Sequence, residues 1–354
     1  MPHPSVRFHN PHLQYASFID LYIKRELSLG ALYESFDENP FCVPLTVSPL
    51  FTVPKDDTDR RVIVDCSYGN TESVNDGIPQ RFFFGEPLRL CYPRHDEFVS
   101  LIVKFGQKCH IWKCDLSRTF RQLHVDPHDL HLLGCKWKGK HYIGNRLIFG
   151  MRSSPQACQQ TTNAISYMLY SANISLVNYV DDFGGVSKSE SSYFDYQYML
   201  DLLNNLGLDV NFGKCVKPST EMVFWGKLYN TESMTVCIPE EKIKETIDLL
   251  HWFEYRKRQL QQLIGKLAFI AECVRSGRLF ISRMLDTLRK YKCNFDKIRL
   301  TLEFRKDVQW WLQFLRIYNG LSLVPDLDRS EPDSVISTDA CLKGLGGINF
   351  ITNQ

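Results

Sequence analysis

The chain has 354 residues, of which 44% are hydrophobic and 23% are charged, and its formal net charge is +2. This composition indicates a globular protein with a sizeable core and excludes an intrinsically disordered chain. No apolar run reaches the ~18 residues that a membrane span needs, and the N-terminus lacks the basic and apolar segments of a secretory signal. We therefore expect no membrane partner and an intracellular location, either cytoplasmic or nuclear.

The distribution of charges and cysteines narrows the class of protein. Residues 101–152 carry ten Lys/Arg against three Asp/Glu, and residues 251–290 carry nine against three. Two basic blocks on a nearly neutral chain indicate an anionic partner that contacts part of the surface, although two ordinary solvated faces would give the same pattern. The twelve cysteines include no C-x-x-C pair, which argues for reduced thiols and against a structural zinc site.

In chain order, the first part of the sequence mixes helical and extended patterns. Apolar residues recur at helical spacing from 13 to 35, and a Pro-marked, β-branched stretch follows at 41–55. The other elements predicted up to residue 238 are a strand at 60–68, a turn-rich segment at 69–79, a helix at 94–105, a strand at 109–116, a hairpin at 132–149, a helix at 155–171, a strand–turn–strand at 174–187, a helix at 191–206 that ends at Gly207, and short strands.

The character of the chain changes at Pro239, where a helical module begins. Its two adjacent tryptophans, Trp310 and Trp311, are interpreted as packing residues, with base stacking as the alternative. The elements predicted beyond Pro239 are amphipathic helices at 240–255, 258–275, 277–291 and 301–318, an acidic linker at 324–334, and the first hairpin of a new sheet at 335–350.

Three carboxylates are the strongest candidates for chemistry. Asp181 and Asp182 occupy the tip of a predicted strand–turn–strand, and Asp115 ends an apolar strand. Adjacent carboxylates repel one another unless a cation neutralises them, and an all-oxygen ligand set suits Mg²⁺ better than zinc. Two such ions can activate a hydroxyl and stabilise the leaving group of an in-line displacement. From the pattern alone, a solvent-exposed Asp-Asp turn and an unrelated Asp remain the alternative.

The chain resembles the reverse transcriptases. Tyr179-Val-Asp-Asp182 matches the signature motif of that family, and Asp115-Leu-Ser-Arg-Thr-Phe120 resembles its other metal-binding motif, in which an aromatic residue follows the Asp by five positions. The remaining similar segments are Val53-Pro-Lys55 and Arg61-Val-Ile-Val-Asp65 of the fingers strands, Phe149-Gly-Met-Arg-Ser-Ser-Pro155 of the nucleotide-cradling loop, Gly207-Leu-Asp-Val-Asn-Phe-Gly-Lys214 near the pyrophosphate, and Phe224-Trp-Gly226 of the hairpin that grips the primer end.

The resemblance implies roles for individual residues. Asp115, Asp181 and Asp182 are then the catalytic residues and the ligands of two Mg²⁺ ions, for which Mn²⁺ could substitute. The nucleotide-binding candidates are Lys55, Arg61, the backbone carbonyl of Leu116, Phe120, Gly150 and Lys214, and the primer- or template-binding candidates are Tyr179, Phe224, Trp225, Gly226, Arg275 and Arg278.

Three of these residues have competing interpretations. Phe120 is either a core aromatic or a steric gate that excludes a ribose 2′-OH. Arg61 is either a strand-surface charge or a triphosphate clamp, and Lys214 is either a turn lysine or a contact of the leaving phosphate. Phe149 departs from the Gln that many family members have there, so a side-chain contact with the nucleotide is lost, which puts the rate and fidelity in doubt and leaves the activity class unaffected.

The resemblance also implies the fold. We expect an α+β right-hand polymerase with fingers, palm and thumb, built on an antiparallel palm sheet and followed by a helical module. The expected domains are an N-terminal helix and fingers at 1–114 with the palm starting near 108, a palm with an inserted part of the fingers at 115–238, a thumb-like helical module at 239–320, a linker at 321–335 and a truncated start of a ribonuclease H-like domain at 336–354.

A finer resemblance is to the DIRS-like retrotransposons, which integrate with a tyrosine recombinase. It depends on Ser73-Val-Asn-Asp-Gly77 and on two segments of the helical module, at 263–285 and 304–320. A ribonuclease H domain follows in that group, and Ile336-Ser-Thr-Asp-Ala340 resembles its first strand, with Asp339 as a metal ligand. The other acidic ligands would lie beyond Gln354, so we expect no ribonuclease H activity from this chain alone.

The sequence therefore predicts an RNA-directed DNA polymerase. It would extend a DNA primer on an RNA or DNA template by two-metal nucleotidyl transfer from deoxynucleoside triphosphates, and it would hold the RNA–DNA hybrid. Two alternatives remain open: an RNA-dependent RNA polymerase with the same palm, which Phe120 disfavours, and a non-catalytic nucleic-acid-binding relic of a retroelement, which the three intact Asp disfavour.

Overall fold

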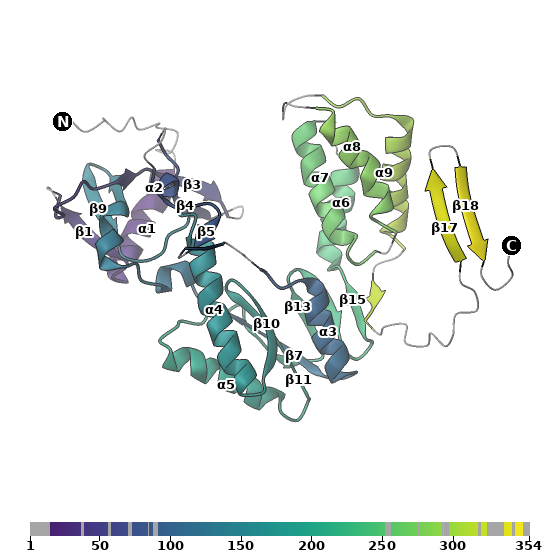
Figure 1. Ribbon diagram of the computed structural model, residues 1–354, viewed down its shortest axis with the longest axis horizontal. Coiled ribbons are helices and arrows are strands. Elements are labelled where there is room, and N and C mark those ends of the chain that lie inside the picture. The colour runs from purple at the N-terminus through teal and green to yellow at the C-terminus, as the bar shows by residue number, and fades with distance from the viewer. Residues whose placement is uncertain are drawn as a thin grey trace. The chain divides into compact units, whose positions relative to one another are not determined.

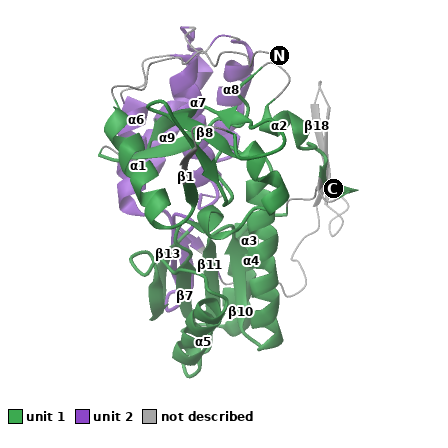
Figure 2. Ribbon diagram, turned by 90° about the vertical axis from the view of Figure 1, so that its left-hand side faces the viewer, with its two compact units in different colours: residues 1–224 green, residues 225–354 purple. Residues whose placement is uncertain are grey.

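The computed structural model describes residues 15–36, 39–55, 58–69, 73–83, 85–87, 91–251, 256–274, 276–291, 293, 297–317, 320–323, 336–341 and 344–349. The chain forms two compact units, residues 1–224 and 225–354, which Figure 2 shows in green and purple. In the described ranges, no helix is long and apolar enough to cross a membrane.

The central sheet of the first unit is antiparallel, with strand order β10-β11-β7-β12 (Figure 1). It confirms the predicted α+β fold with an antiparallel sheet, and the strand–turn–strand expected at 174–187 is its β10–β11 hairpin. The middle strand β7 is buried at four of its six positions, as expected for a strand with neighbours on both sides. The strands are β7 (His110–Asp115), β10 (Ser175–Tyr179), β11 (Asp182–Ser187) and β12 (Val216–Ser219).

The two faces of this sheet carry different residues and are covered by different helices. Trp112 and Cys114 of β7 belong to an apolar cluster with residues of α4 (Ser154–Ser171) and α5 (Ser192–Asn205). Because neighbouring strand residues point to opposite faces, Asp115 lies on the other face. That face is partly covered by α3 (His95–Phe105), whose Phe98 ring packs 4.9 Å from Phe224 of β13 (Glu221–Phe224). Figure 1 shows α3 on one side of the sheet and α4 and α5 on the other.

Another part of the first unit is built from short strands around a second apolar core. One sheet has the order β1-β9-β8-β2, with β2 and β8 parallel, and β3 and β4 form a separate hairpin. The elements are α1 (Ala16–Ser28), β1 (Leu32–Phe36), β2 (Val47–Ser48), β3 (Leu50–Pro54), β4 (Arg60–Val64), α2 (Val74–Gly77), β5 (Phe82–Phe83), β6 (Glu86–Pro87), the 3₁₀ helices η2 (Thr119–Gln122) and η3 (Pro127–Leu132), β8 (Gly134–Trp137) and β9 (Lys140–Gly144).

The helix expected over 13–35 is shorter in the structure. It ends at Ser28, because Gly30 adopts φ +63°, a left-handed conformation that glycine tolerates and a helix cannot continue through. The chain then reverses into β1, which pairs antiparallel with β9. Within the turn-rich segment expected at 69–79, the structure has a one-turn helix, α2, whose N-cap Ser73 forms a capping box with Asp76.

The second unit contains four helices within its described residues, as the sequence predicts, together with a small antiparallel sheet. Helix α7 ends at Ile270, earlier than the expected 275, and Ala271, Cys273 and Val274 after it are buried in the core. The elements are β14 (Lys227–Asn230), β15 (Thr235–Cys237), α6 (Glu240–His251), α7 (Lys257–Ile270), α8 (Leu279–Arg289), α9 (Leu302–Phe314), β16 (Leu321–Ser322), β17 (Ile336–Cys341) and β18 (Gly344–Asn349).

The two adjacent tryptophans of α9 pack the helices together. Trp311 is fully buried, and its indole NH donates to the carbonyl of Phe280 at 3.4 Å. The ring of Trp310 stacks on Phe280 at 3.8 Å and on Phe314 at 4.5 Å. With both faces of Trp310 covered, the packing interpretation holds and base stacking has no open ring face here.

The C-terminal hairpin predicted at 335–350 is present as β17 and β18, in which Asp339 pairs with Gly346. The acidic linker expected at 324–334 lies outside the described residues. The boundaries of the five expected domains stay predictions, since the division after Phe224 separates compact units and does not correspond to any of them.

Candidate active site

Two of the three candidate carboxylates face each other across neighbouring strands. Asp115 at the end of β7 pairs with Asp182 at the start of β11, so their side chains share one face of the sheet. Asp181 lies in the adjoining turn, and its carbonyl accepts a 3.0 Å hydrogen bond from the amide of Leu116. The fold therefore places Asp115 at the same end of the central sheet as Asp181 and Asp182, although Asp115 and Asp181 are 66 positions apart in sequence.

Two lysines contact this carboxylate group. The Nζ atom of Lys113 lies 2.8 Å from Oδ1 of Asp182, and the Nζ atom of Lys214 lies 3.4 Å from Oδ2 of Asp115. Lys113 is two positions before Asp115 on the same face of β7, which explains why it reaches the partner strand. The sequence reasoning missed Lys113; its signal is a charged residue in an otherwise apolar strand.

The electrostatics of the site favour bound cations. Burial, a hydrogen bond with Asp182 and the charges of both neighbouring carboxylates raise the pKa of Asp115 to about 6, against the opposing charge of Lys214. Burial and the charge of Asp182 also raise the pKa of Asp181. Asp115 is only 2% exposed, and its Oδ1 atom has no hydrogen-bond partner. Crowded, buried carboxylates of this kind are stabilised by a cation that shares their charge.

A divalent metal fits the donor set, although the side chains are not arranged as a finished ligand cluster. Throughout the described part of the chain, no three His, Cys, Asp or Glu side chains are positioned to hold a metal ion. The two lysines compensate the charge in the structure as it stands. The donors are all carboxylate oxygens, the ligands that Mg²⁺ prefers, and a partnerless oxygen on Asp115 is available.

The turn that carries Asp181 is strained and is held in place by α4. Val180 adopts φ +53°, an unusual backbone conformation for a β-branched residue. Its amide donates to Oε1 of Gln159 at 2.8 Å, while Nε2 of Gln159 donates to the carbonyl of Asn178 at 3.2 Å. Gln159 is 2% exposed, so these bonds are protected from water. One amide side chain thus holds both sides of the turn.

A second layer of polar contacts supports Gln159. The Nδ2 atom of Asn178 donates to Thr162 at 3.1 Å and to Asn163 at 2.9 Å, and Asn163 also accepts from Gln159. The sequence reasoning assigned no role to these residues. The available signal was polar side chains at positions 159, 162 and 163, which lie on one face of a helix next to the Asp-Asp turn.

The structure brings together three residues of the candidate nucleotide site. The Phe120 ring lies 4.8 Å from the Phe149 ring, and the Arg61 guanidinium lies 4.9 Å from the centre of the same ring. The Phe149 ring thus contacts both neighbours, and the effect of this ring on rate and fidelity stays a prediction. Phe120 is half-buried, so neither the gate nor the core interpretation is decided by its exposure.

The loop that follows Phe149 needs its glycine. Gly150 adopts φ +113°, and a Cβ atom there would collide with the carbonyl of Val64. The buried Asn75 holds the loop: its Nδ2 donates to the Gly150 carbonyl at 2.8 Å, and its Oδ1 accepts from the Arg152 amide at 2.7 Å. Asn75 belongs to the segment 73–77, which the sequence comparison noted only as a subgroup marker.

The other nucleotide-binding candidates, Lys55, Leu116 and Lys214, make separate contacts. Lys55 forms an exposed ion pair with Asp59 at 2.7 Å within the β3–β4 hairpin. The carbonyl of Leu116, proposed as a metal ligand, accepts a 3.3 Å hydrogen bond from Thr119. Lys214 contacts a catalytic candidate through its side chain, since its Nζ atom lies 3.4 Å from Oδ2 of Asp115.

The primer-binding candidates straddle the boundary between the two units. In the first unit, Tyr179 is 42% exposed, with its ring 4.7 Å from that of Tyr92, whereas Phe224 is fully buried beside Gly184 and so uses its ring in the core. In the second unit, Trp225 has φ +45° and Gly226 has φ +75°. The backbone of this segment thus adopts positive φ angles at two successive residues, but the Phe224 side chain is not a surface group.

The helical module carries fewer free positive charges than its sequence suggests. Three of the basic residues form ion pairs within the unit: Lys266 with Glu245, Arg283 with Asp307, and Arg289 with Asp286. Arg278 is exposed at the start of α8. Arg275 lies outside the described residues, and Asp339 is a residue of strand β17.

Comparison with known proteins defines the class. The model of the family "Reverse transcriptase (RNA-dependent DNA polymerase)" matches residues 53–229, half of the chain, so the chain belongs to this family. It is also similar to the retrovirus-related Pol polyprotein from transposon 297 of Drosophila melanogaster, with 22% identity over 332 residues. That match covers 93% of this chain but only 28% of the relative, so the chain spans less than a third of the polyprotein.

Solved structures confirm the fold. A foamy viral protease–reverse transcriptase in complex with double-stranded DNA superposes with a TM-score of 0.69 at 18% identity, covering 100% of this chain and 56% of that one. The same viral protein in complex with an RNA/DNA hybrid gives a TM-score of 0.66 at 18% identity, covering 88% and 38%. These matches support the expected right-hand polymerase fold.

Proposed function

We propose that this chain is an RNA-directed DNA polymerase that extends a primer by two-metal nucleotidyl transfer. The observation that carries the proposal is the pairing of Asp115 with Asp182 across β7 and β11, with Asp181 in the adjoining turn. The family membership gives the class of reaction, and this cluster of carboxylates supports its catalytic centre. The retained acidic residues also argue against the alternative of a non-catalytic relic.

Asp115, Asp181 and Asp182 would hold two Mg²⁺ ions, with Mn²⁺ as a substitute. Bound there, the metal pair supplies activation of the primer 3′-hydroxyl and stabilisation of the leaving pyrophosphate. The chain's own residues prepare the site. Lys113 keeps the Asp182 carboxylate oriented toward the shared face at 2.8 Å. Lys214, at 3.4 Å from Asp115 and 61% exposed, is positioned to turn toward a leaving phosphate.

The incoming deoxynucleoside triphosphate would bind beside Phe120 and Phe149. Arg61, held over the Phe149 ring, would contact the phosphates, and Lys55 of the same hairpin would add charge. The backbone at Gly150 would approach the nucleotide closely, because no side chain intervenes. Phe120 would exclude the 2′-OH, which supports DNA synthesis over the alternative of RNA synthesis.

The nucleic-acid partners are an RNA template, a DNA primer and their hybrid duplex. The support comes from the foamy viral structures, whose complexes hold double-stranded DNA and an RNA/DNA hybrid. Tyr179 and the Trp225–Gly226 turn would contact the primer end. The exposed Arg278, and Arg275 near it in sequence, would contact duplex phosphates without reading bases.

The finer classification also belongs to this proposal. We place the chain in the DIRS-like retrotransposons on the sequence segments named above, and we interpret the β17–β18 hairpin as the first hairpin of a ribonuclease H-like domain with Asp339 as a ligand. Synthesis would occur in the cytoplasm or the nucleus.

Primer extension tests the proposal and separates it from its alternatives. The purified chain is given a DNA primer on an RNA or a DNA template, Mg²⁺, and either deoxynucleotides or ribonucleotides. The proposal predicts extension on both templates with deoxynucleotides alone. Preferential use of ribonucleotides would indicate the RNA polymerase, and duplex binding without extension in either Mg²⁺ or Mn²⁺ would indicate the relic.

A further inference from the structure

A cavity of about 620 Å³ lies on the side of the central sheet opposite the carboxylates. Its walls come from η2, the segment 123–124, Arg146, helix α4 and the end of α5 with residues 206–209. Helices α4 and α5 cover the face that carries Trp112 and Cys114, whereas Asp115 points to the other face. We call this cavity the rear pocket. Its volume is in the range of small-molecule sites.

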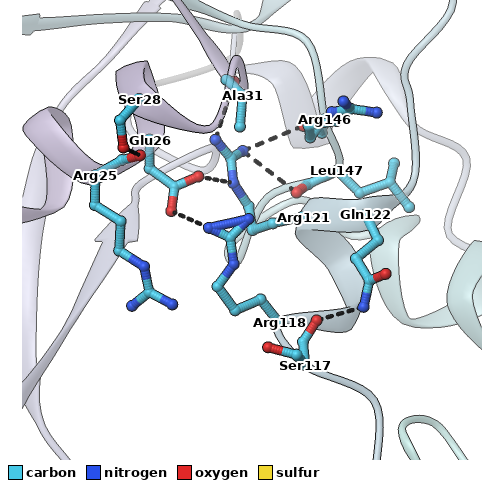
Figure 3. A network of polar contacts seen from close by, with 10 residues as sticks. All are labelled: Arg25, Glu26, Ser28, Ala31, Ser117, Arg118, Arg121, Gln122, Arg146 and Leu147. Carbon is cyan, nitrogen blue, oxygen red and sulfur yellow. Dashed lines mark hydrogen bonds and ion pairs between the residues drawn. The ribbon is translucent and has the colours of Figure 1, made fainter. Parts of the chain in front are cut away.

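One wall of the rear pocket is cationic. Arg118, Arg121 and Arg146 all line it, together with one acidic residue, Asp209. Figure 3 shows the network around these arginines, in which one buried carboxylate, Glu26, contacts two of them. Arg121 is fully engaged, since it bonds to Glu26 at 2.8 Å and to three backbone carbonyls.

The other two arginines, Arg118 and Arg146, make fewer hydrogen bonds within the chain than Arg121 does. The Nε atom of Arg146 is buried and has no hydrogen-bond partner. Arg118 reaches Glu26 only at 3.4 Å, and its backbone is held at φ +51°. Burial lowers the pKa of Arg118, and the charges of Arg25 and Arg121 lower it further, against the opposing charges of Glu26 and Asp209. Partly buried guanidinium groups with an unpaired nitrogen favour an added anion.

The rear pocket is also lined by apolar side chains. They are Ile165 and Met168 of α4, Leu206 and Leu208 in the segment that follows α5, and Leu123. Met168 is 45% exposed even though it borders a cavity, so its apolar surface is incompletely covered by the chain. A ligand that fills this space must therefore carry apolar surface as well as charge.

Hydrogen bonds connect the residues that line the pocket to the segments that carry the catalytic residues. The Gln122 side chain accepts from the amide of Asp209 at 2.6 Å and donates to the carbonyls of Asp209 and Ser117. Further along the same two segments, the amide of Asn211 donates to the carbonyl of Asp115 at 2.8 Å. A ligand against residues 206–209 therefore contacts the segment that leads to Lys214.

We propose that the rear pocket binds a small amphipathic anion, in which one carboxylate, sulfonate or phosphate group is carried by an apolar body of about one or two rings. The acidic group pairs with Arg146 and Arg118, and the apolar body packs on Met168 and Leu208. The site is distinct from the nucleotide site, because it lies on the helix-covered face of the sheet. Its occupancy needs no catalysis, so the proposal stands or fails independently of polymerase activity.

Isothermal titration of the full chain with naphthalene-1-sulfonate tests the proposal, with 1-naphthalenemethanol as the neutral probe and tripolyphosphate as the hydrophilic anion. We expect one equivalent of the sulfonate to bind at least about tenfold more tightly than either of the others, since a charge-assisted hydrogen bond contributes roughly 1.5–3 kcal/mol. Equal or tighter binding of tripolyphosphate, equal binding of the alcohol, or no binding of the sulfonate would overturn it.

Variants locate the binding. Arg146→Gln should weaken the sulfonate about tenfold, the loss expected for one charged partner, whereas Lys188→Gln, an exposed cation at the end of β11, should change it less than about twofold. Met168→Trp should abolish binding by filling the cavity, with the melting temperature showing that the chain remains folded. Unchanged binding in both pocket variants would place the sulfonate elsewhere and refute the site.

Discussion

The backbone amide of Val180 donates a 2.8 Å hydrogen bond to Oε1 of Gln159, which joins the turn before Asp181 to helix α4. This contact sustains a left-handed valine one residue before Asp181. Without it, nothing on the helix side would hold the turn amide, and the backbone could relax toward an ordinary conformation. The position of the Asp181 carboxylate thus depends on a residue outside the recognisable motifs.

Replacing Gln159 with Leu should therefore slow nucleotide addition about ten- to a hundredfold, the effect of losing a buried hydrogen bond of roughly 1–3 kcal/mol. Gln160→Leu, at the exposed neighbouring position of α4, is the matched control and should retain the parent rate. The effect of Gln159→Leu should shrink when Val180 is also replaced by Gly, because glycine adopts positive φ without strain. Single-turnover rates measure this cycle, and equal losses in both backgrounds would contradict the clamp.

Phe120→Ala should increase ribonucleotide incorporation. If the ring excludes a 2′-OH, its removal relieves a clash of roughly 1–3 kcal/mol, and discrimination against ribonucleotides should drop about ten- to a hundredfold. Phe149→Leu, which removes the ring that contacts Phe120, should lower discrimination less and raise the KM for deoxynucleotides, because Arg61 loses its ring contact. Competition between ATP and dATP at one template position provides the measurement. A Phe120→Ala variant that discriminates like the parent would make Phe120 a core residue.

The metal-free protein should lose stability as the pH rises through the titration of Asp115. Its pKa is raised from 3.8 to about 6, so between these values the folded chain retains a proton that the unfolded chain releases. The raised pKa therefore stabilises the fold below about pH 4, and this contribution disappears above about pH 6. Relative to Asp115→Asn, the free energy of unfolding should fall by roughly 2–3 kcal/mol across this window, since one pKa unit corresponds to about 1.4 kcal/mol.

Urea unfolding in EDTA at pH 4, 5, 6 and 7 measures that difference, and adding Mg²⁺ should reduce it, because a bound cation favours the charged carboxylate. Parallel curves for the parent and Asp115→Asn would show that Asp115 is not perturbed by its neighbours.

The helical module should contain basic residues of two kinds. Arg278 is exposed, so Arg278→Ala should lower the slope of log affinity against log salt by about 0.9 for one lost phosphate contact on duplex DNA. Arg283 is paired with the buried Asp307 at 2.9 Å, so Arg283→Ala should instead lower the melting temperature. Fluorescence anisotropy on one duplex gives the salt slope. If Arg278→Ala changes stability and leaves the slope intact, the duplex is held elsewhere.

Local sequence patterns predict the central sheet and the acidic cluster well. Alternation on both sides of Asp181 and Asp182 indicates a hairpin, and Asp115 ends an apolar strand, so all three positions follow from nearby residues. The length of the first helix was wrong, because periodicity does not detect that Gly30 ends it and that β1 pairs with distant β9. Pairing across more than a hundred residues leaves no local trace.

Contacts that support the site were the hardest to foresee. Gln159 and Asn75 are polar residues in helices, and only the fold brings their amides to the turns at Val180 and Gly150. The positive charge of the helical module was overestimated, since a charge count does not show that Arg283 faces Asp307. Sequence patterns therefore identified the three acidic residues that the fold brings to one end of the sheet, whereas the groups that hold their turns required three-dimensional contacts.

The most direct test of the account is single-turnover incorporation of one deoxynucleotide by the Asp181→Asn variant on an RNA template in Mg²⁺. Asp201→Asn serves as the control, because it removes a carboxylate from the exposed side of α5 and keeps its oxygen toward Gln197. The account predicts active parent and Asp201→Asn proteins and a rate reduced at least about a hundredfold in Asp181→Asn, through the loss of one metal ligand. Incorporation by Asp181→Asn at a rate near that of the parent would contradict the account.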